Sequence, residues 1–122
     1  MRVAVYFNLH KNIFSVQSRE KESYGRVIDH VESVVLNAPT FVVRQAGRKK
    51  VIEDKKKNVH AFVVGHITDG VEVLAKEEVV TYNPYKYTSF VKEETREPVS
   101  KAECAVIRFG FDGKPLISAY GA

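Results

Sequence analysis

The chain has 122 residues, of which 44% are apolar, enough for one domain, residues 1–122, whose core needs no metal or disulfide. Its single cysteine, Cys104, excludes an intrachain disulfide, and no apolar run reaches the length of a membrane span. The net charge of +4 predicts an anionic partner, which could be a nucleic acid, a nucleotide or an acidic protein. We therefore expect a soluble, cytoplasmic protein.

The first part of the chain predicts short strands separated by polar turns. Residues 3–7 alternate as a strand does, and residues 13–17 resume the pattern after a polar interruption, so we expect an opening hairpin. A charged loop follows. Gly25 then begins a strand at residues 26–28, and the apolar residues 34–36 lead into a turn at 37–39.

The middle of the chain predicts a strand, a basic helix and a second strand. Residues 40–43 are β-branched or aromatic, as in a half-buried strand. In residues 45–57 helix formers dominate, and Val51 and Ile52 are almost the only large apolar side chains, so we expect a helix with a narrow buried stripe. Residues 59–67 then return as a strand.

The positive charge is concentrated in this helix. From Arg44 to Lys57 there are seven cationic and two acidic residues, a net charge of +5 compared with +4 for the whole chain. The lysines at 55–57 stand at the predicted helix C-terminus, where cations complement the helix dipole. Five net charges exceed what capping needs, so we expect a local basic surface.

The second half of the chain predicts further hairpins. The expected strands are residues 71–74, 79–82, 104–111 and 116–120. Asp69-Gly70 is a hairpin-turn signal before the first of them, and Pro84 ends the second, because proline lacks a backbone donor. Together the elements predict a mainly β (α+β) fold: an antiparallel β-sandwich or partly closed barrel with one packed basic helix.

Side chains that could carry catalysis or hold a metal do not cluster in the sequence. His60 and His66 would lie about 20 Å apart along one strand, too far to share a metal. His66-Ile67-Thr68 resembles the tripeptide of two-histidine phosphoesterases, but those enzymes need a second copy, and none is present. Cys104 lies in an apolar strand, which favours a structural thiol. We therefore expect a protein that is not an enzyme and has no catalytic residue, metal or cofactor.

Aromatic residues gather in one loop that could bind a planar ligand. Residues 82–90 hold three of the six tyrosines, and such rings can stack on a base, a contact worth about 1–3 kcal/mol per base. Tyr82, Tyr85 and the amide of Asn83 are the candidates here. Tyrosines around a proline equally fit a packed loop that anchors two strands.

Two arginines on strands are further candidates. Arg108 should point away from the apolar face formed by its neighbours, as a rigid fork for a phosphate or an aromatic plane. An ion pair with a glutamate on a neighbouring strand would explain it as well. Arg26, at a strand start, is a candidate of the same kind.

Several short strings carry a resemblance to a known family. They are Val3-Ala4-Val5-Tyr6-Phe7-Asn8-Leu9-His10-Lys11, Gly25-Arg26-Val27, Asn58-Val59-His60-Ala61-Phe62-Val63-Val64-Gly65 and Tyr82-Asn83-Pro84-Tyr85. Together they look like small phage-encoded proteins, and among these the chain resembles the first-described Thoeris anti-defence family, whose members act as sponges.

This resemblance implies a β-rich domain with a helix, assembled as a homodimer or higher homo-oligomer in the cytoplasm of the infected host. It further implies binding of a cyclic ADP-ribose-type nucleotide without cleavage, and some members also hold cyclic oligonucleotides. The ligand-binding residues predicted for this chain are Arg26, Lys57, Tyr82, Asn83, Tyr85 and Arg108.

The alternative prediction is a nucleic-acid-binding or host-protein-inhibiting protein that acts through the basic helix from Arg44 to Lys57. A long polyanion would have to avoid residues 69–103, which carry eight acidic and five basic side chains. A third possibility, a virion or assembly component, predicts neither kind of ligand.

Overall fold

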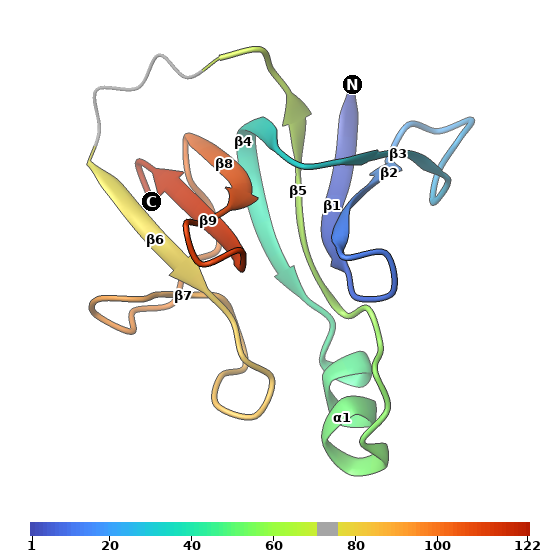
Figure 1. The fold of residues 1–122 in the computed structure, drawn as a ribbon, viewed down its shortest axis with the longest axis vertical. Coiled ribbons are helices and arrows are strands. Elements are labelled where there is room, and N and C mark those ends of the chain that lie inside the picture. The colour runs from blue at the N-terminus through green and yellow to red at the C-terminus, as the bar shows by residue number, and fades with distance from the viewer. Residues whose placement is uncertain (71–75) are drawn as a thin grey trace.

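The computed structural model describes residues 1–70 and 76–122, and these residues form one antiparallel sheet and one helix (Figure 1). The strands are β1 (Arg2–Asn8), β2 (Ile13–Ser18), β3 (Val27–Val31), β4 (Val34–Val43), β5 (Ala61–Ile67), β6 (Glu77–Thr81), β7 (Val91–Lys92), β8 (Cys104–Phe109) and β9 (Pro115–Tyr120); the helix is α1 (Gln45–Asp54). Across the sheet they follow the order β3-β2-β1-β5-β4-β8-β9-β6-β7. The predicted mainly β fold with one helix is confirmed.

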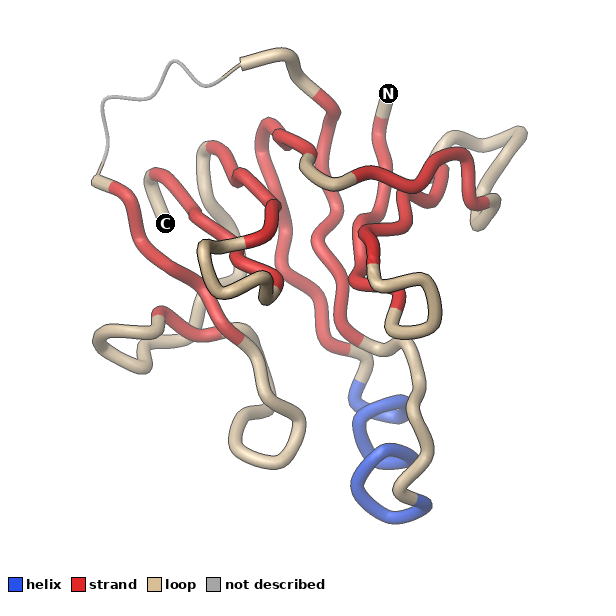
Figure 2. The backbone as a smooth tube through the Cα atoms, viewed as in Figure 1, coloured by secondary structure: helices blue, strands red, loops and turns tan. Residues whose placement is uncertain are grey.

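The sheet curls so that parts of its inner face meet, although it does not close into a barrel (Figures 1 and 2). Phe109 of β8 packs against Phe7 of β1 and Phe14 of β2, with ring centroids 5.9 and 5.0 Å apart. In the sheet, β5 and β4 separate β1 from β8. These rings therefore touch only because the sheet bends back on itself.

The inner face carries one hydrophobic core. Val3 and Val5 of β1 meet Val16 of β2, Leu36 of β4 and Ile107 of β8 in a single buried cluster. Alternate residues of a strand point to the same face, so the apolar alternation of these strands becomes this core. Burying a Val, Leu or Ile side chain stabilises the fold by about 1.5–3 kcal/mol.

β4 is one continuous strand where the sequence predicted two strands and a turn. Its register with β5 shifts between Asn37 and Thr40, and Ala38 adopts a φ of +48°. An irregularity of this kind is the place where a strand tolerates a proline, and Pro39 is buried there. The predicted turn is wrong, because these residues bend the strand instead of reversing it.

α1 follows β4 directly and projects past the end of the sheet, where the prediction had it packed on the sheet (Figure 1). It ends at Asp54, because Lys55 adopts the left-handed conformation, with a φ of +54°. The predicted end at Lys57 is therefore wrong. Lys55 is the C-cap residue, and Lys56 and Lys57 follow it in an exposed connection, so none of the three lies within the last turn of the helix.

Other predicted elements agree with the structure where it describes them. The first and last hairpins are present as β1–β2 and β8–β9, whereas the short β7 was not predicted. The strand predicted at residues 71–74 lies outside the described residues. No helix in the described part of the chain is long and apolar enough to cross a membrane.

α1 approaches the start of β5 closely at Gly47. A Cβ atom at this position would lie 2.5 Å from the Cβ atom of His60 and 3.0 Å from Nδ2 of Asn58. Glycine within a helix costs about 1 kcal/mol relative to alanine. Only a residue without a side chain allows the helix to lie this near to His60, which explains the glycine.

Replacing Gly47 with alanine should lower the free energy of unfolding by about 1–3 kcal/mol, because the added methyl group overpacks the contact with His60. This sign is opposite to the usual effect of Gly→Ala in a helix. Thermal and urea unfolding measure it. The control is Gly70→Ala, where an added Cβ meets no atom of the described residues within 4 Å. Equal or greater stability of Gly47→Ala would contradict the packing argument.

Candidate functional site

The tyrosine-rich loop, residues 82–90, is held by side chains of α1. Nε of Arg48 donates hydrogen bonds to the carbonyl oxygens of Pro84 and Tyr87, both at 3.0 Å. Nε2 of Gln45 donates to the carbonyl oxygen of Thr88 at 2.8 Å. Arg48 is thus directed inward, and the helix and the loop form one unit at this end of the molecule.

Tyr82 is a packed residue of this unit. Nδ1 of His60 contacts the carbonyl oxygen of Asn58 at 2.8 Å, and because a carbonyl only accepts, Nδ1 carries the hydrogen. Nε2 of His60 therefore accepts from the Tyr82 hydroxyl, also at 2.8 Å. The Tyr82 ring lies 5.3 Å from the ring of Phe90. Burial raises the pKa of the Tyr82 hydroxyl above 10.0, and the nearby charge of Arg48 opposes this shift.

Asn83 shapes the loop backbone. Its Oδ1 accepts a hydrogen bond from the backbone N–H of Tyr85 at 2.9 Å, and its carbonyl oxygen accepts from the N–H groups of Lys86 and Tyr87. These are the contacts of an Asx turn, so the amide oxygen predicted to read a base is already occupied. Tyr85, in contrast, is 65% exposed and presents its ring to solvent.

The two arginines predicted to clamp a ligand lie apart from this loop. Arg108 is exposed on the outer face of β8, where its only hydrogen bond among the described residues goes to the carbonyl oxygen of Phe109. Arg26 is exposed just before β3, beside Ser18 at the end of β2, whereas β8 approaches the opposite end of β2, where Phe109 packs on Phe14. The structure therefore does not bring Arg26, Arg108 and Tyr82 to one place within a single chain.

Tyr82 borders a cavity of about 230 Å³ on the inner face of the sheet. Aromatic and aliphatic residues dominate its wall, including Phe7, Phe14 and Phe90. No lysine or arginine is among the residues that line it. This cavity can hold an apolar or aromatic group, but it has no cation for a phosphate.

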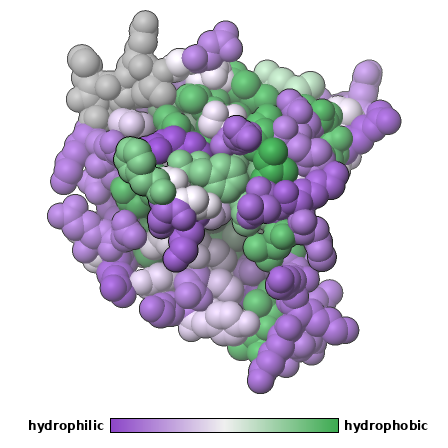
Figure 3. Space-filling view, in the orientation of Figure 1, coloured by the Kyte–Doolittle hydropathy of each residue, from purple (hydrophilic) through white to green (hydrophobic). Residues whose placement is uncertain are grey.

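The cationic side chains gather on the projecting element. Arg44, Lys49 and Lys50 are exposed on or beside α1, and Lys55, Lys56 and Lys57 follow it; we call these six residues the basic surface. Figure 3 shows hydrophilic side chains over the outer side of this projection, with hydrophobic surface on the side toward the loop. The buried stripe of α1 is narrow, as predicted, and only Val51 is buried.

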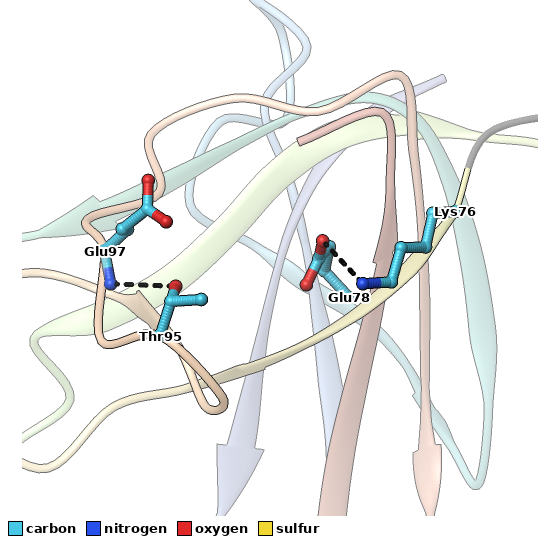
Figure 4. Close-up of polar contacts among 4 residues, drawn as sticks. All are labelled: Lys76, Glu78, Thr95 and Glu97. Carbon is cyan, nitrogen blue, oxygen red and sulfur yellow. Dashed lines mark hydrogen bonds and ion pairs between the residues drawn. The ribbon is translucent and has the colours of Figure 1, made fainter.

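Ion pairs are few in the part of the chain that the structure describes. Lys49 pairs with Glu53 one turn along α1, at 3.9 Å. The other pair is Lys76–Glu78, at 4.0 Å, at the start of β6. Figure 4 shows this pair together with a loop contact in which the backbone N–H of Glu97 donates a hydrogen bond to Oγ1 of Thr95. Most cations of the basic surface therefore have no carboxylate partner among the described residues.

A serine and a histidine lie close together, but their proton arrangement is wrong for a nucleophile. Lys11 donates to Nε2 of His30 at 3.3 Å, so Nδ1 of the neutral ring donates to Oγ of Ser15 at 3.1 Å. Asn8 donates to the same oxygen, and Ser15 is fully buried. An activated serine needs the reverse proton direction and an accessible hydroxyl. This cluster ties β2 and β3 together.

Cys104 is a free, buried thiol. Burial raises its pKa, whereas the backbone N–H of Ala105 opposes the shift. A catalytic or redox-active cysteine needs a lowered pKa. Among the described residues, no three His, Cys, Asp or Glu side chains are placed to hold a metal ion.

Sequence reasoning missed the residues that organise this end of the molecule. Gln45, Arg48 and His60 are all contacts of the loop, and the loop is far from them in sequence. It also missed Arg19, whose guanidinium lies 5.0 Å from the ring centre of Phe62, as does that of Arg44 at 5.2 Å. One feature of the sequence could have indicated the position of Arg44. Alternation along the strand puts Arg44 on the same face as Val42, which pairs with Phe62.

The fold and this surface define a class: a small antiparallel β protein that carries its excess positive charge on one projecting element. The family model described as Mycobacterium phage L5 gene 82 protein matches residues 1–110. A relative, the Gene 82 protein of Mycobacterium phage L5, is 38% identical, and the match covers 84% of this chain and 86% of that protein. The chain belongs to the Mycobacterium phage L5 gene 82 protein family. No solved structure gives a significant match.

The predicted phage origin is confirmed by this family. The finer resemblance, to the Thoeris anti-defence sponges, has no support from these comparisons and stays a prediction.

Replacing Tyr82 with phenylalanine should lower the free energy of unfolding by about 1 kcal/mol at neutral pH, because Nε2 of His60 loses its donor. The folded protein holds the Tyr82 proton more tightly than the unfolded chain does. Stability from this residue is therefore present below pH 10 and is lost as the pH rises through the raised pKa.

Urea unfolding from pH 7 to pH 11 measures both effects. Wild type should lose stability above pH 10 more steeply than Tyr82→Phe. Tyr85→Phe is the control, because its exposed hydroxyl makes no hydrogen bond among the described residues. Parallel pH profiles of wild type and Tyr82→Phe would show that Tyr82 is not buried in this way.

Proposed function

We propose that this phage protein binds nucleic acid through its basic surface. The observation that supports the proposal is the position of the charge: residues 44–57 carry +5, more than the whole chain, and lie on an element that projects from the sheet. Lys and Arg side chains bind phosphates and release the condensed counterions, which makes such binding favourable at low salt.

The charges of this surface are free to meet a ligand. Its one ion pair among the described residues, Lys49–Glu53, lies at the surface, where such pairs contribute about 0–1 kcal/mol and dissociate easily. The left-handed turn at Lys55 reverses the chain, which runs back beside α1 until Asn58 reaches the carbonyl oxygen of Gly47, so Lys56 and Lys57 add their charge beside the helix.

Residues 69–103 are rich in carboxylates, which repel a polyanion, but the projection of α1 lets a polyanion avoid them. A helix of ten residues is about 15 Å long. A polyanion that lies along it contacts the cations at the end of the molecule and need not pass over the acidic strands and loops. The proposal involves no bond-breaking step.

Replacing Lys56 and Lys57 with glutamine should weaken binding to a labelled oligonucleotide, because two phosphate contacts are lost. The slope of log K against log salt should become less steep by about 1.4–1.8. Fluorescence anisotropy across a salt series measures both quantities.

The matched control is the pair Lys101→Gln and Lys114→Gln, which removes the same charge from exposed positions outside the basic surface. If both double variants weaken binding equally, only net charge matters and the basic surface is not the site. If wild type binds no oligonucleotide at low salt, the proposal fails.

A second candidate is the predicted sponge, which sequesters a cyclic ADP-ribose-type nucleotide without cleaving it. The cavity beside Tyr82 favours this function, because an adenine-like ring could enter the cavity and pack against the aromatic side chains of its wall. The phosphates would need cations that one chain does not bring there. A second copy could supply Arg26 or Arg108, so this candidate requires a homodimer or higher homo-oligomer.

Incubation with cyclic ADP-ribose, removal of the protein by filtration and release by heat would test the sponge. We expect depletion of the nucleotide, its recovery intact, and ligand-dependent self-association in sedimentation. Recovery of a cleaved product would instead identify an enzyme. If the nucleotide is not depleted, the second candidate is eliminated and the first is unaffected.

A further inference from the structure

Four side chains on the outer face of the sheet form an alternating stack of rings and guanidinium groups. The guanidinium of Arg19 contacts two rings, 4.8 Å from the centre of Tyr24 and 5.0 Å from that of Phe62. The guanidinium of Arg44 lies over Phe62 as well, at 5.2 Å. The order is therefore Tyr24, Arg19, Phe62, Arg44; we call this the cation–π stack.

The strands determine this arrangement. Phe62 belongs to a small hydrophobic cluster with Ala4, separate from the inner core. Val42 pairs with Phe62, so Arg44, two residues further on, emerges on the same face. Arg19 follows β2 and pairs with the start of β1. The short side chain of Ala4 leaves room on β1 for the guanidinium to reach Phe62.

The two arginines of the stack differ in their surroundings. Arg19 is committed to packing: it donates to the Tyr24 hydroxyl, and its Nε is buried without a partner among the described residues. Phe62 is covered, at 7% exposed. Arg44 is exposed, and no carboxylate in the described part of the chain pairs with it. The Cζ atom of Arg44 lies over the ring of Phe62, and the residue as a whole remains exposed to solvent.

A guanidinium that is positioned over one ring and exposed to solvent can also stack on a second planar group. Its N–H edges remain available for a phosphate or a base edge. Arg44 is also the residue that precedes α1, so a ligand stacked on it lies at the start of the basic surface. A nucleobase on Arg44 would place the adjoining phosphates along the lysines of α1.

We infer that Arg44 is a base-stacking residue and that the nucleic acid this protein binds is single-stranded. This inference rests on the proposed function and names its substrate class. Bases of a duplex are stacked on one another and cannot lie on Arg44, whereas an unpaired base can. The lysines bind phosphates of either form, so selectivity for single strands comes from the cation–π stack.

The test replaces Arg44 with lysine, which keeps the charge and removes the planar group. The probes are labelled oligothymidylate, oligouridylate and a DNA duplex, each measured by anisotropy at one salt concentration. Wild type should prefer a single strand. Arg44→Lys should weaken its binding by about fivefold to a hundredfold and leave the duplex within about twofold. The two single-stranded probes distinguish DNA from RNA.

Arg96→Lys is the matched control, because it makes the same change at an exposed arginine that has no cation–π contact among the described residues. A strand carrying 2-aminopurine gives a second readout, since stacking on Arg44 should quench its fluorescence in wild type and less in Arg44→Lys. Equal losses for duplex and single strand would show that Arg44 acts only as a charge, which overturns the inference and leaves the proposed function standing. No binding of any probe by wild type overturns both.

Discussion

The structure depends on one constraint: a nine-stranded antiparallel sheet must bury one face although its helix does not lie across it. The sheet meets this constraint by curling until Phe109 reaches Phe7 and Phe14. The strands thus cover each other, and the apolar residues of β1, β2, β4 and β8 share one core. Curling on a bulged β4 also leaves α1 at the end of the sheet, where it is free to project.

The outer face follows from the same geometry. No second sheet packs on it in the described part of the chain, and the ring of Phe62 is covered by the guanidinium groups of Arg19 and Arg44. An arginine can bury a ring and keep its charge near water, which an aliphatic side chain cannot do. The contacts that stabilise this face therefore also leave positive charge on it, next to the basic surface.

The projecting helix and the loop 82–90 are coupled more tightly than their separation in sequence suggests. Arg48 donates hydrogen bonds to the loop backbone, and the hydrogen bond between His60 and Tyr82 joins the loop to the start of β5. Several loop residues that were predicted to bind a ligand therefore stabilise the fold instead. Tyr85 and the lysines beyond Asp54 remain exposed.

The sequence by itself determined the mainly β class, the two terminal hairpins, the outward orientation of Arg108 and the local concentration of charge. These features depend on alternation, turn residues and composition, which are properties of short segments. Only the tertiary structure decided that Asn37–Thr40 is a bulge, that Arg26 and Arg108 lie apart, and that Arg19 and Arg44 share one ring. Each of these depends on which strands become neighbours and on how the sheet curls, and contacts between distant segments leave no periodic trace in a single chain.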